Sequence, residues 1–346
     1  MLRYRFAALA LLLISSSDGM ADVYTSRPTT TAIRQATADC TLGTAPKATG
    51  IIGISDPHAV NPKVIALVKE TGVRWVRAEI IWSDVQPTPS SKYDWSKYDA
   101  MINGYHQAGI NVLAILTYIP RTMPGDWAQI DAQFQGFATA AVKRFAPKGV
   151  HYWEIFNEPN LPGYGWLVKG LNARDFLGAY TLLLARANKA VRDNDPLGTV
   201  VLGGLASDNP GGIPAEDTMK FIYDAGARYC FDVFAFHPYG YQNNFQAARA
   251  RVDAMMSAGQ DTGKPVWFNE YGWTDYSKMD MNIFKSVDNN PMMAVFKQRN
   301  QADALFWFSV KDYSSKWGTP AFGLADFYFR KRKSFWTFKY LVNQAE

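Results

Sequence analysis

Two glutamates with near-identical neighbours could do acid–base chemistry in this chain. Glu158 and Glu270 each follow an asparagine, Asn157 and Asn269, and each comes at the end of an apolar run typical of a buried strand. Glycoside hydrolysis uses a pair of carboxyl groups flanking one bond, with one acting as acid and the other as base or nucleophile. The pair therefore predicts that the chain cleaves glycosidic bonds.

The elements that must position these glutamates recur along the chain. Apolar runs predict eight strands, at residues 50–54, 74–80, 111–118, 151–157, 199–203, 231–237, 265–269 and 304–310. Segments with helical spacing lie between or after them, at residues 61–70, 95–108, 133–145, 174–191, 215–225, 245–258 and 333–343. This alternation indicates parallel βαβ units, and eight of them predict an α/β fold, the (β/α)8 TIM barrel. An open doubly wound sheet is the rival, but no glycine-rich phosphate motif follows the first strand.

The N-terminal region divides into two segments before the folded domain. Residues 1–21 have a basic start, an apolar run and small residues before the expected cleavage point, which predicts a signal peptide. Residues 22–46 lack periodicity, and we expect an extended arm. Residues 47–346 should form a single catalytic domain. The chain is then expected to be secreted or periplasmic, with no stable membrane insertion after the signal is cleaved.

The net charge argues against a nucleic acid partner, and the two cysteines allow at most one disulfide within the chain. The formal charge of +5 falls to +4 without residues 1–21, and we interpret the run at residues 330–333 as a solvated loop, so we expect no nucleic acid partner. A weak preference for an acidic polysaccharide stays open. The two cysteines, Cys40 and Cys230, either form one disulfide or are unrelated buried thiols. The sequence clusters too few ligands to predict a metal site, and we expect no cofactor.

Residues near the predicted strand ends supply the candidate site, because a barrel of this kind builds its active site there. These residues are carboxylates, amides, imidazoles, aromatics and one arginine. Sugars need such a mixture, since hydroxyl groups take hydrogen bonds while the C–H face of a pyranose packs on a ring. The candidates are His58, Arg77, Trp82, Tyr118, Asn157, Glu158, His237, Tyr239, Asn269, Glu270 and Trp307.

The motif Asn157-Glu158-Pro159, with a second glutamate at the end of the seventh strand, resembles clan A of the retaining glycoside hydrolases. Within the clan, the stretches at residues 74–77, 82–87 and 153–160 look most like family 39 and related bacterial exopolysaccharide hydrolases. The resemblance implies that Glu158 is the acid/base, Glu270 the nucleophile and Asn157 the partner of the sugar 2-hydroxyl. It also implies that Arg77 is the cation that keeps Glu270 charged.

The remaining candidate residues could contact the two glutamates or the substrate. Tyr239 or His237 could hydrogen-bond one of the two glutamates, and Trp307 could form the floor of the subsite that holds the reacting sugar. Trp82 and His58 are candidate substrate-binding residues. Glu154 lies inside a predicted strand, so we expect a structural ion pair, with an arginine as the partner.

The principal hypothesis is an exported retaining β-glycosidase that acts on an oligo- or polysaccharide. Aromatic residues in the predicted rim loops favour an endo mode of cleavage, namely Trp166, Tyr241, Trp273, Tyr276, Tyr313 and Trp317. One alternative is a carbohydrate-binding or matrix protein without turnover, which the intact acid pair disfavours. A transglycosylase is the other alternative, because it would keep both carboxylates.

Overall fold

The computed structural model describes residues 26–57, 59–123, 125–162, 171–207, 211–241, 244–273, 291–314 and 321–345. The predicted signal peptide, residues 1–21, lies outside these ranges. No helix within them is long and apolar enough to cross a membrane.

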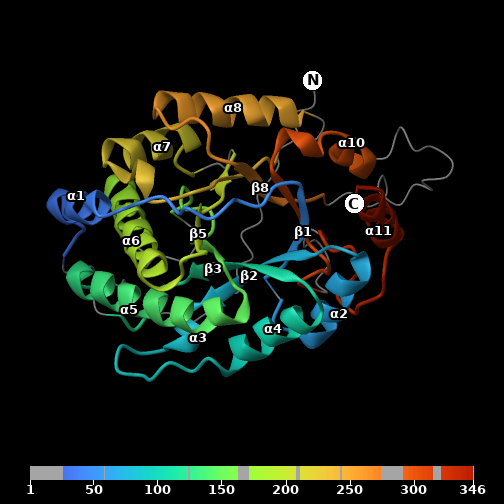
Figure 1. Cartoon of the computed structure of the whole chain (residues 1–346), viewed down its shortest axis with the longest axis horizontal. Helices are drawn as coiled ribbons and strands as arrows, with labels where there is room; N and C mark the ends of the chain where they lie inside the picture. Colours follow the sequence, from blue (N-terminus) through green and yellow to red (C-terminus); the bar gives the residue numbers. More distant parts are fainter. Residues whose placement is uncertain are drawn as a thin grey trace.

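Parallel strands form the centre of the molecule (Figure 1). They are β1 (Ile51–Ser55), β2 (Trp75–Ile81), β3 (Asn111–Thr117), β4 (Tyr152–Ile155), β5 (Thr199–Leu202), β6 (Leu205–Ala206), β7 (Phe234–His237), β8 (Val266–Tyr271) and β9 (Ala304–Phe308). Their order in the sheet is β5-β4-β3-β2-β1-β9-β8-β7-β6.

The two ends of this sheet meet, so the sheet closes into a barrel. Only Gly203 and Gly204 separate β5 from β6, and both segments lie against the same neighbour. β6 pairs with β7, and Val201 of β5 forms a parallel bridge with Val233, just before β7. The nine segments therefore occupy eight positions, and the predicted (β/α)8 barrel is confirmed.

Helices surround the barrel (Figure 1). They are α1 (Thr30–Ala38), α2 (Pro62–Thr71), α3 (Trp82–Val85), α4 (Ser96–Gln107), α5 (Trp127–Phe145), α6 (Ala173–Asn194), α7 (Ala215–Asp224), α8 (Phe245–Ala258), α10 (Pro291–Lys297) and α11 (Lys333–Ala345). Local sequence sets several of their ends. The Asn61 side chain accepts a hydrogen bond from the Lys63 amide (2.9 Å) before Pro62 starts α2, and Gly72 ends that helix at φ 93°.

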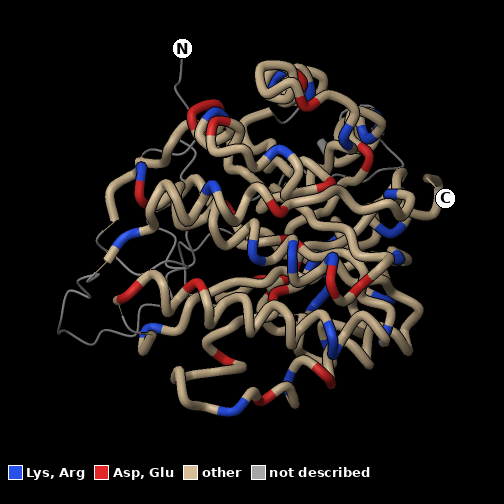
Figure 2. Tube along the Cα trace, turned by 60° about the vertical axis from the view of Figure 1, so that its left-hand side comes forward, with Lys and Arg blue, Asp and Glu red and all other residues tan. Residues whose placement is uncertain are grey.

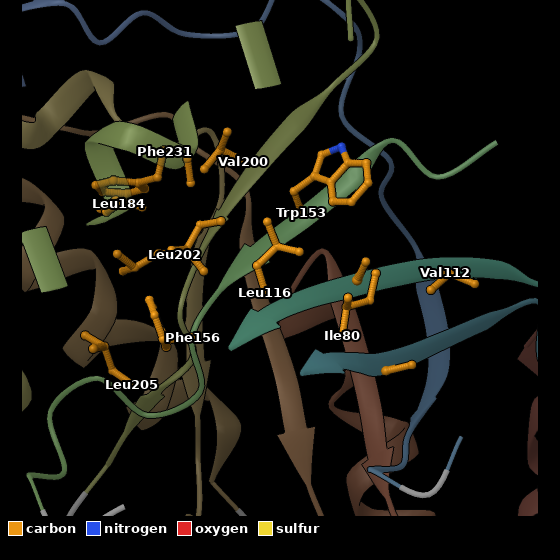
Figure 3. Packing of buried hydrophobic residues seen from close by; sticks show 14 of the residues in the cluster. Ile80, Val112, Leu116, Trp153, Phe156, Leu184, Val200, Leu202, Leu205 and Phe231 are labelled. Carbon is orange, nitrogen blue, oxygen red and sulfur yellow. The ribbon is translucent and has the colours of Figure 1, made fainter. Parts of the chain in front are cut away.

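Two apolar cores lie on the two faces of the strands. The outer core fills the space between strands and helices, and Figure 3 shows part of it, including Ile80, Leu116, Phe156, Leu184 and Leu202. A smaller cluster includes inward-facing residues toward the N-terminal ends of the strands. We call it the lower interior, and it consists of Ile51, Leu113, Val201, Val233, Ala235, Trp267, Ala304 and Phe306.

The described part of the expected arm, residues 26–46, is not extended throughout. Residues 30–38 form α1, whose Ile33 and Ala36 are buried and which packs against α6. Burial of these apolar side chains stabilises a helix that composition alone did not indicate. Cys40, just after α1, forms a disulfide with Cys230, so the bridged alternative of the two cysteine interpretations is confirmed.

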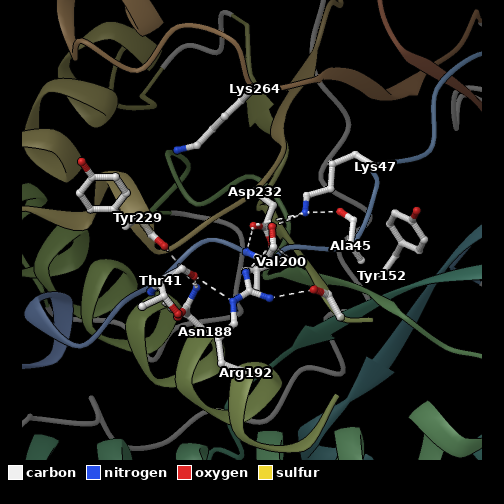
Figure 4. A network of polar contacts seen from close by, with 12 residues as sticks. Thr41, Ala45, Lys47, Tyr152, Asn188, Arg192, Val200, Tyr229, Asp232 and Lys264 are labelled. Carbon is white, nitrogen blue, oxygen red and sulfur yellow. Dashed lines mark hydrogen bonds and ion pairs between the residues drawn. The ribbon is translucent and has the colours of Figure 1, made fainter. Parts of the chain in front are cut away.

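Polar contacts fix the segment between α1 and β1 (Figure 4). Asp232 is buried and accepts hydrogen bonds from the amides of Gly43 (2.6 Å) and Val200 (2.7 Å) and from the Arg192 guanidinium (2.5 Å). Lys47 lies 3.8 Å from the same carboxylate. Acidic and basic residues are otherwise interspersed along the chain trace in Figure 2.

Candidate active site

A β-bulge turns Glu270 toward the barrel interior. Phe268 of β8 pairs with Leu305, but Tyr271 pairs with Trp307, so three steps along β8 match two steps along β9. One extra residue in a strand re-aims the side chains beside it. Phe268 and Tyr271 both belong to the outer core, and the intervening Asn269 and Glu270 face inward.

A tight turn aims Glu158 from the end of β4. Phe156 and Glu158 have φ values of 59° and 45°, a left-handed conformation that non-glycine residues adopt at a cost. The Glu158 amide donates to the carbonyl oxygen of Gly204 (3.1 Å), which holds the turn against the next strand. The Glu158 side chain is buried, with 4% exposed.

The two glutamates and His237 come together at the C-terminal ends of the strands, a region that we call the catalytic rim. One oxygen of Glu158, one of Glu270 and one ring nitrogen of His237 all lie within 4.8 Å of one another. This is close to the roughly 5–5.5 Å between carboxyl groups that retaining glycosidases use. Three such groups can also be ligands for a cation, but the Arg77 guanidinium, 2.9 Å from Glu270, would repel a divalent ion here.

Arg77 of β2 is the centre of a buried polar network. Its Nε and Nη2 atoms donate to the two oxygens of Glu154 (2.7 and 2.8 Å), and Nη1 donates to Glu270 Oε2 (2.9 Å). Further hydrogen bonds run to Asn157 Oδ1 (2.6 Å) and Ser55 Oγ (3.0 Å). The predicted ion pair of Glu154 with an arginine is confirmed, and so is the expected contact between Arg77 and Glu270.

Glu270 is held in a fixed orientation by two donors. Arg77 bonds one carboxyl oxygen, and the Tyr239 hydroxyl donates to the other, Oε1, at 3.0 Å. Burial raises the pKa of Glu270, whereas Arg77 and the Tyr239 hydrogen bond lower it by favouring the charged form. The predicted hydrogen bond of Tyr239 to one of the glutamates is thus present.

His237, at the end of β7, contacts the other glutamate. Its Nδ1 lies 2.8 Å from Glu158 Oε1, and its ring is fully buried. Burial lowers the pKa of His237 to about 4, although the negative charge of Glu270 opposes the change. The imidazole is therefore neutral at physiological pH.

Gly204 makes room for this imidazole. A Cβ atom at position 204 would lie 2.1 Å from His237 Nε2 and 2.6 Å from Asn269 Oδ1. Its amide also donates to Glu154 Oε1 at 3.0 Å. Only glycine allows the chain between β5 and β6 to pass this close to the site. The Gly203-Gly204 pair is visible in the sequence, but this role was not predicted from it.

Asn157 presents an amide group beside Arg77. Its oxygen accepts from Arg77, and its nitrogen makes no hydrogen bond to the described residues. The side chain is partly exposed. A donor is thus available next to the two glutamates.

Two aromatic predictions are wrong, and one candidate was not tested. Trp307 is 1% exposed and packs against Phe338 of α11 (5.9 Å between ring centroids), because odd-numbered positions of β9 face the helices. Trp82 is fully buried, stacks on Phe137 of α5 and donates to Gln86 Oε1 at 2.9 Å. Neither ring is available to a sugar. His58 lies outside the described residues.

Two residues that the sequence reasoning did not single out face the rim. Glu79 shares the inward face of β2 with Arg77, is partly exposed, and makes no hydrogen bond to the described residues. Burial raises its pKa to about 7; Arg77 opposes this and Glu270 adds to it. Phe308 shares the inward face of β9 with Phe306 and is partly exposed. Alternation counted from Arg77 would have found Glu79.

The expected rim aromatics divide into two groups. Tyr241, Trp273 and Tyr313 are partly buried. The Tyr241 hydroxyl accepts from Arg251 at 3.3 Å, and the Tyr313 ring lies 5.5 Å from that of Phe308. Trp166, Tyr276 and Trp317 lie outside the described residues.

Comparison with known proteins points to sugar-cleaving enzymes. The family described as Cellulase (glycosyl hydrolase family 5) matches residues 45–314, more than three quarters of the chain. A sequence search of curated proteins finds no match.

Solved structures share the fold at low sequence identity. A family 39 glycoside hydrolase from Bacteroides cellulosilyticus superposes with a TM-score of 0.63 at 18% identity, over 86% of this chain and 65% of that one. A monomeric β-xylosidase from Caulobacter crescentus gives 0.63 and 18%, over 87% and 69%. A family 1 β-glucosidase from Thermotoga maritima gives 0.62 and 13%, over 88% and 99%. The chain thus spans just under two thirds of the first of these proteins.

Proposed function

The chain belongs to the cellulase family, glycosyl hydrolase family 5, and is a glycoside hydrolase of clan A; from that premise we propose that it hydrolyses β-glycosidic bonds with retention of configuration. Glu158 acts as the acid/base and Glu270 as the nucleophile. The observation that carries this proposal is that an oxygen of the Glu158 carboxyl group lies within 4.8 Å of an oxygen of the Glu270 carboxyl group. That separation suits direct attack by one carboxylate, because an inverting enzyme needs room for a water molecule between the sugar and its base.

In the first step, a carboxylate oxygen of Glu270 attacks the anomeric carbon and forms a glycosyl ester. Glu158 donates its proton to the glycosidic oxygen as the bond to the leaving sugar breaks. In the second step, Glu158 takes a proton from a water molecule, whose oxygen attacks the same carbon. The ester bond breaks and Glu270 is regenerated.

The neighbouring side chains prepare the two glutamates for different tasks. Arg77 and Tyr239 bond the two oxygens of Glu270 and favour its charged form, as a nucleophile requires. Neutral His237 donates from Nδ1 to Glu158 Oε1, which leaves Oε2 to carry the proton toward the leaving group. Asn157 donates to the sugar 2-hydroxyl, since its oxygen is occupied by Arg77.

The substrate we propose is an oligo- or polysaccharide, cleaved internally. The similar structures include proteins named as a β-xylosidase and a β-glucosidase. Substrates that contain β-linked xylose or glucose therefore come first in a screen. The leader pattern of residues 1–21 and the Cys40–Cys230 disulfide support export to an oxidising compartment. Purified polysaccharides and product sizing separate long products of endo cleavage from single sugars.

Two variants test the assignment of the glutamates. With an aryl β-glycoside as substrate, Glu270→Ala should lose turnover, and added azide should give a glycosyl azide of inverted configuration. Glu158→Ala keeps the nucleophile, so azide should intercept the ester and give a glycosyl azide of retained configuration. Asp253→Asn on α8, an exposed carboxylate paired with Arg249, serves as the control and should hydrolyse normally.

The products also discriminate among the alternatives. Undiminished hydrolysis by Glu270→Ala, or the two azide configurations exchanged, would overturn the roles of Glu270 as nucleophile and Glu158 as acid/base. Oligosaccharide binding by the unaltered protein without any cleavage would favour a binding protein. Longer products at high acceptor concentration would favour transglycosylation over hydrolysis.

A further inference from the structure

Exposed aromatic side chains gather near the C-terminal end of the described chain. Seven large hydrophobic residues are exposed in the described ranges, and four of them, all aromatic, fall between residues 327 and 340. They are Phe327, Tyr328, Trp336 and Tyr340. Single exposed hydrophobic residues need no explanation, but a cluster on one surface marks an interaction site.

The helix α11 does not need its exposed rings to pack. Its inner face buries Phe335, Phe338 and Leu341, and Phe338 contacts Phe296 of α10 at 5.6 Å between ring centroids. Trp336 and Tyr340 are four residues apart and therefore share the opposite face, where they are 51% and 44% exposed. The core is complete without them.

A second pair of exposed aromatic residues lies in the turn shortly before α11. Ala325 and Lys331 form an antiparallel bridge, and Phe327 and Tyr328 lie in the turn between them, with ring centroids 5.4 Å apart. The Lys331 amine lies 5.2 Å from the Trp336 ring and also bonds Glu70 at 2.5 Å. We call this set the C-terminal aromatic surface: Phe327, Tyr328, Lys331, Trp336 and Tyr340.

Positive charge accompanies these rings. Residues 333–345 contain Lys333 and Lys339 and no acidic residue. The Lys339 amine lies 5.9 Å from the Trp336 ring. Lys333 is exposed in the first turn of α11, where the helix dipole disfavours a cation. Helix stability therefore does not favour this lysine, and its exposed amine is accessible to an anionic ligand.

The C-terminal aromatic surface begins near the catalytic rim and continues down the outside of the barrel along α11. α11 is the helix that follows β9, so its first turn, which holds Trp336, is at the end of the barrel where the strands finish. Lys311, just beyond β9, places its amine 4.8 Å from the Phe327 ring. A long substrate bound at the rim can reach this surface.

We propose that the C-terminal aromatic surface binds an acidic polysaccharide outside the catalytic site. Pyranose rings stack on Trp336 and Tyr340, and carboxylate or sulfate groups of the chain pair with Lys333 and Lys339. Acidic units belong here rather than at the catalytic site, where the ionised nucleophile Glu270 would repel them. The inference rests on the proposed function, since a polysaccharide substrate is what makes a second contact useful.

Native electrophoresis in gels that contain a polysaccharide tests this binding. Polygalacturonate or alginate should retard the unaltered protein, whereas neutral hydroxyethylcellulose should not. A Trp336→Ala/Tyr340→Ala double variant should bind the acidic polymers about tenfold more weakly, because it loses both stacking rings. Tyr229→Ala is the matched control, since Tyr229 is also 51% exposed and has Arg228 5.9 Å from its ring. It should bind normally.

A second double variant tests the contribution of the lysine charges. Cleavage of a small aryl glycoside separates the proposed surface binding from the proposed hydrolysis. Lys333→Gln/Lys339→Gln should weaken retardation by acidic polymers while circular dichroism shows a folded protein. Equal retardation of the unaltered protein and both double variants, or retardation by the neutral polymer alone, would overturn the inference. If the unaltered protein cleaves aryl glycosides but acidic gels do not retard it, this inference fails alone; if it cleaves no glycoside, the proposed function fails.

Discussion

The lower interior and the catalytic rim lie on the same strands, but the first is apolar and the second contains charged and polar side chains. Along the inward face of β2 the residues change from Trp75 to Arg77 to Glu79, and along β8 from Trp267 to Asn269. Toward the N-terminal ends, apolar rings such as Trp267 and Phe306 fill the barrel. Closer to the C-terminal ends of the strands, polar and charged side chains such as Arg77, Asn269 and Glu270 take their place.

This difference separates what holds the fold from what does the chemistry. The lower interior gains stability from burial of apolar surface and contains no charged residue. At the rim, Glu79, Glu154 and Glu270 crowd around one arginine, and burial raises the pKa of both Glu79 and Glu270. Placing several buried carboxylates close together lowers the stability of the fold, and such destabilising arrangements are common at functional sites. Substitutions at the rim should therefore lower turnover, whereas substitutions in the lower interior should lower stability and leave turnover per folded molecule unchanged.

Removing the central cation should have the largest effect. Arg77→Met leaves Glu154 buried without its ion-pair partner and frees Glu270, so we expect a loss of about 3–5 kcal/mol in the free energy of unfolding. We also expect kcat/KM for an aryl glycoside to fall about a thousandfold. Urea unfolding and steady-state kinetics measure both. The surface variant Arg249→Met should change neither, and an active Arg77→Met enzyme would refute the role of the network.

The lower interior should respond in stability alone. Trp267→Ala removes a fully buried ring and should lower the free energy of unfolding by about 3–5 kcal/mol. Turnover per folded molecule, determined by titrating active sites at low temperature, should stay within about twofold of the unaltered enzyme. A large loss of turnover in the folded fraction would mean that the two regions are not separable.

A backbone change at the rim should affect activity with little effect on the core. Gly204→Ala pushes its new methyl group against His237, so the imidazole should move away from Glu158, and kcat should fall about ten- to a hundredfold. Gly136→Ala on α5 is the control, because the Tyr93 hydroxyl is the nearest atom there, at 3.3 Å. Unchanged kcat and an unchanged pH profile in Gly204→Ala would show that His237 does not tune Glu158.

The smallest effect we predict concerns Glu79 and pH. Its pKa of about 7 in the folded protein lies above the ordinary value of 4.5, so its contribution to stability is present below pH 4.5 and is lost as the pH rises through 7. Glu79→Gln should therefore become more stable relative to the unaltered protein between pH 4.5 and 7.5. The relative gain should be on the order of 1–3 kcal/mol. Urea unfolding at the two pH values measures it; a constant difference would contradict the shift.

Periodicity was sufficient to predict the barrel. Each predicted strand overlaps an observed one, because strands buried on both faces carry long apolar runs that are visible in the sequence. Helix α1 could not be predicted this way, since its stability comes from packing on α6. The disulfide stayed open for a similar reason: the approach of Cys40 to Cys230 depends on tertiary structure.

Site residues could be predicted where the type of residue reveals its role. They could not be predicted where the role depends on which face of a strand the side chain occupies. The contacts of Arg77, Tyr239 and His237 with the two glutamates follow from positions on the inward face of a strand or at and just after its end. Trp307 was assigned to the wrong face because a shift of one residue reverses the direction of a side chain. The bulge that turns Glu270 inward has no signal in the local sequence, since register is set by pairing with β9.

Covalent trapping tests the central claim most directly. A 2-fluoro substituent slows formation and breakdown of the glycosyl ester, and a dinitrophenyl leaving group restores its formation, so the intermediate accumulates. We propose to treat the protein with 2-deoxy-2-fluoro-β-glucoside, xyloside and mannoside dinitrophenyl derivatives and to map the label by mass spectrometry. At least one reagent should attach one sugar per molecule to Glu270. Label on Glu158 or on another residue, or no label from any of the three reagents, would contradict the account.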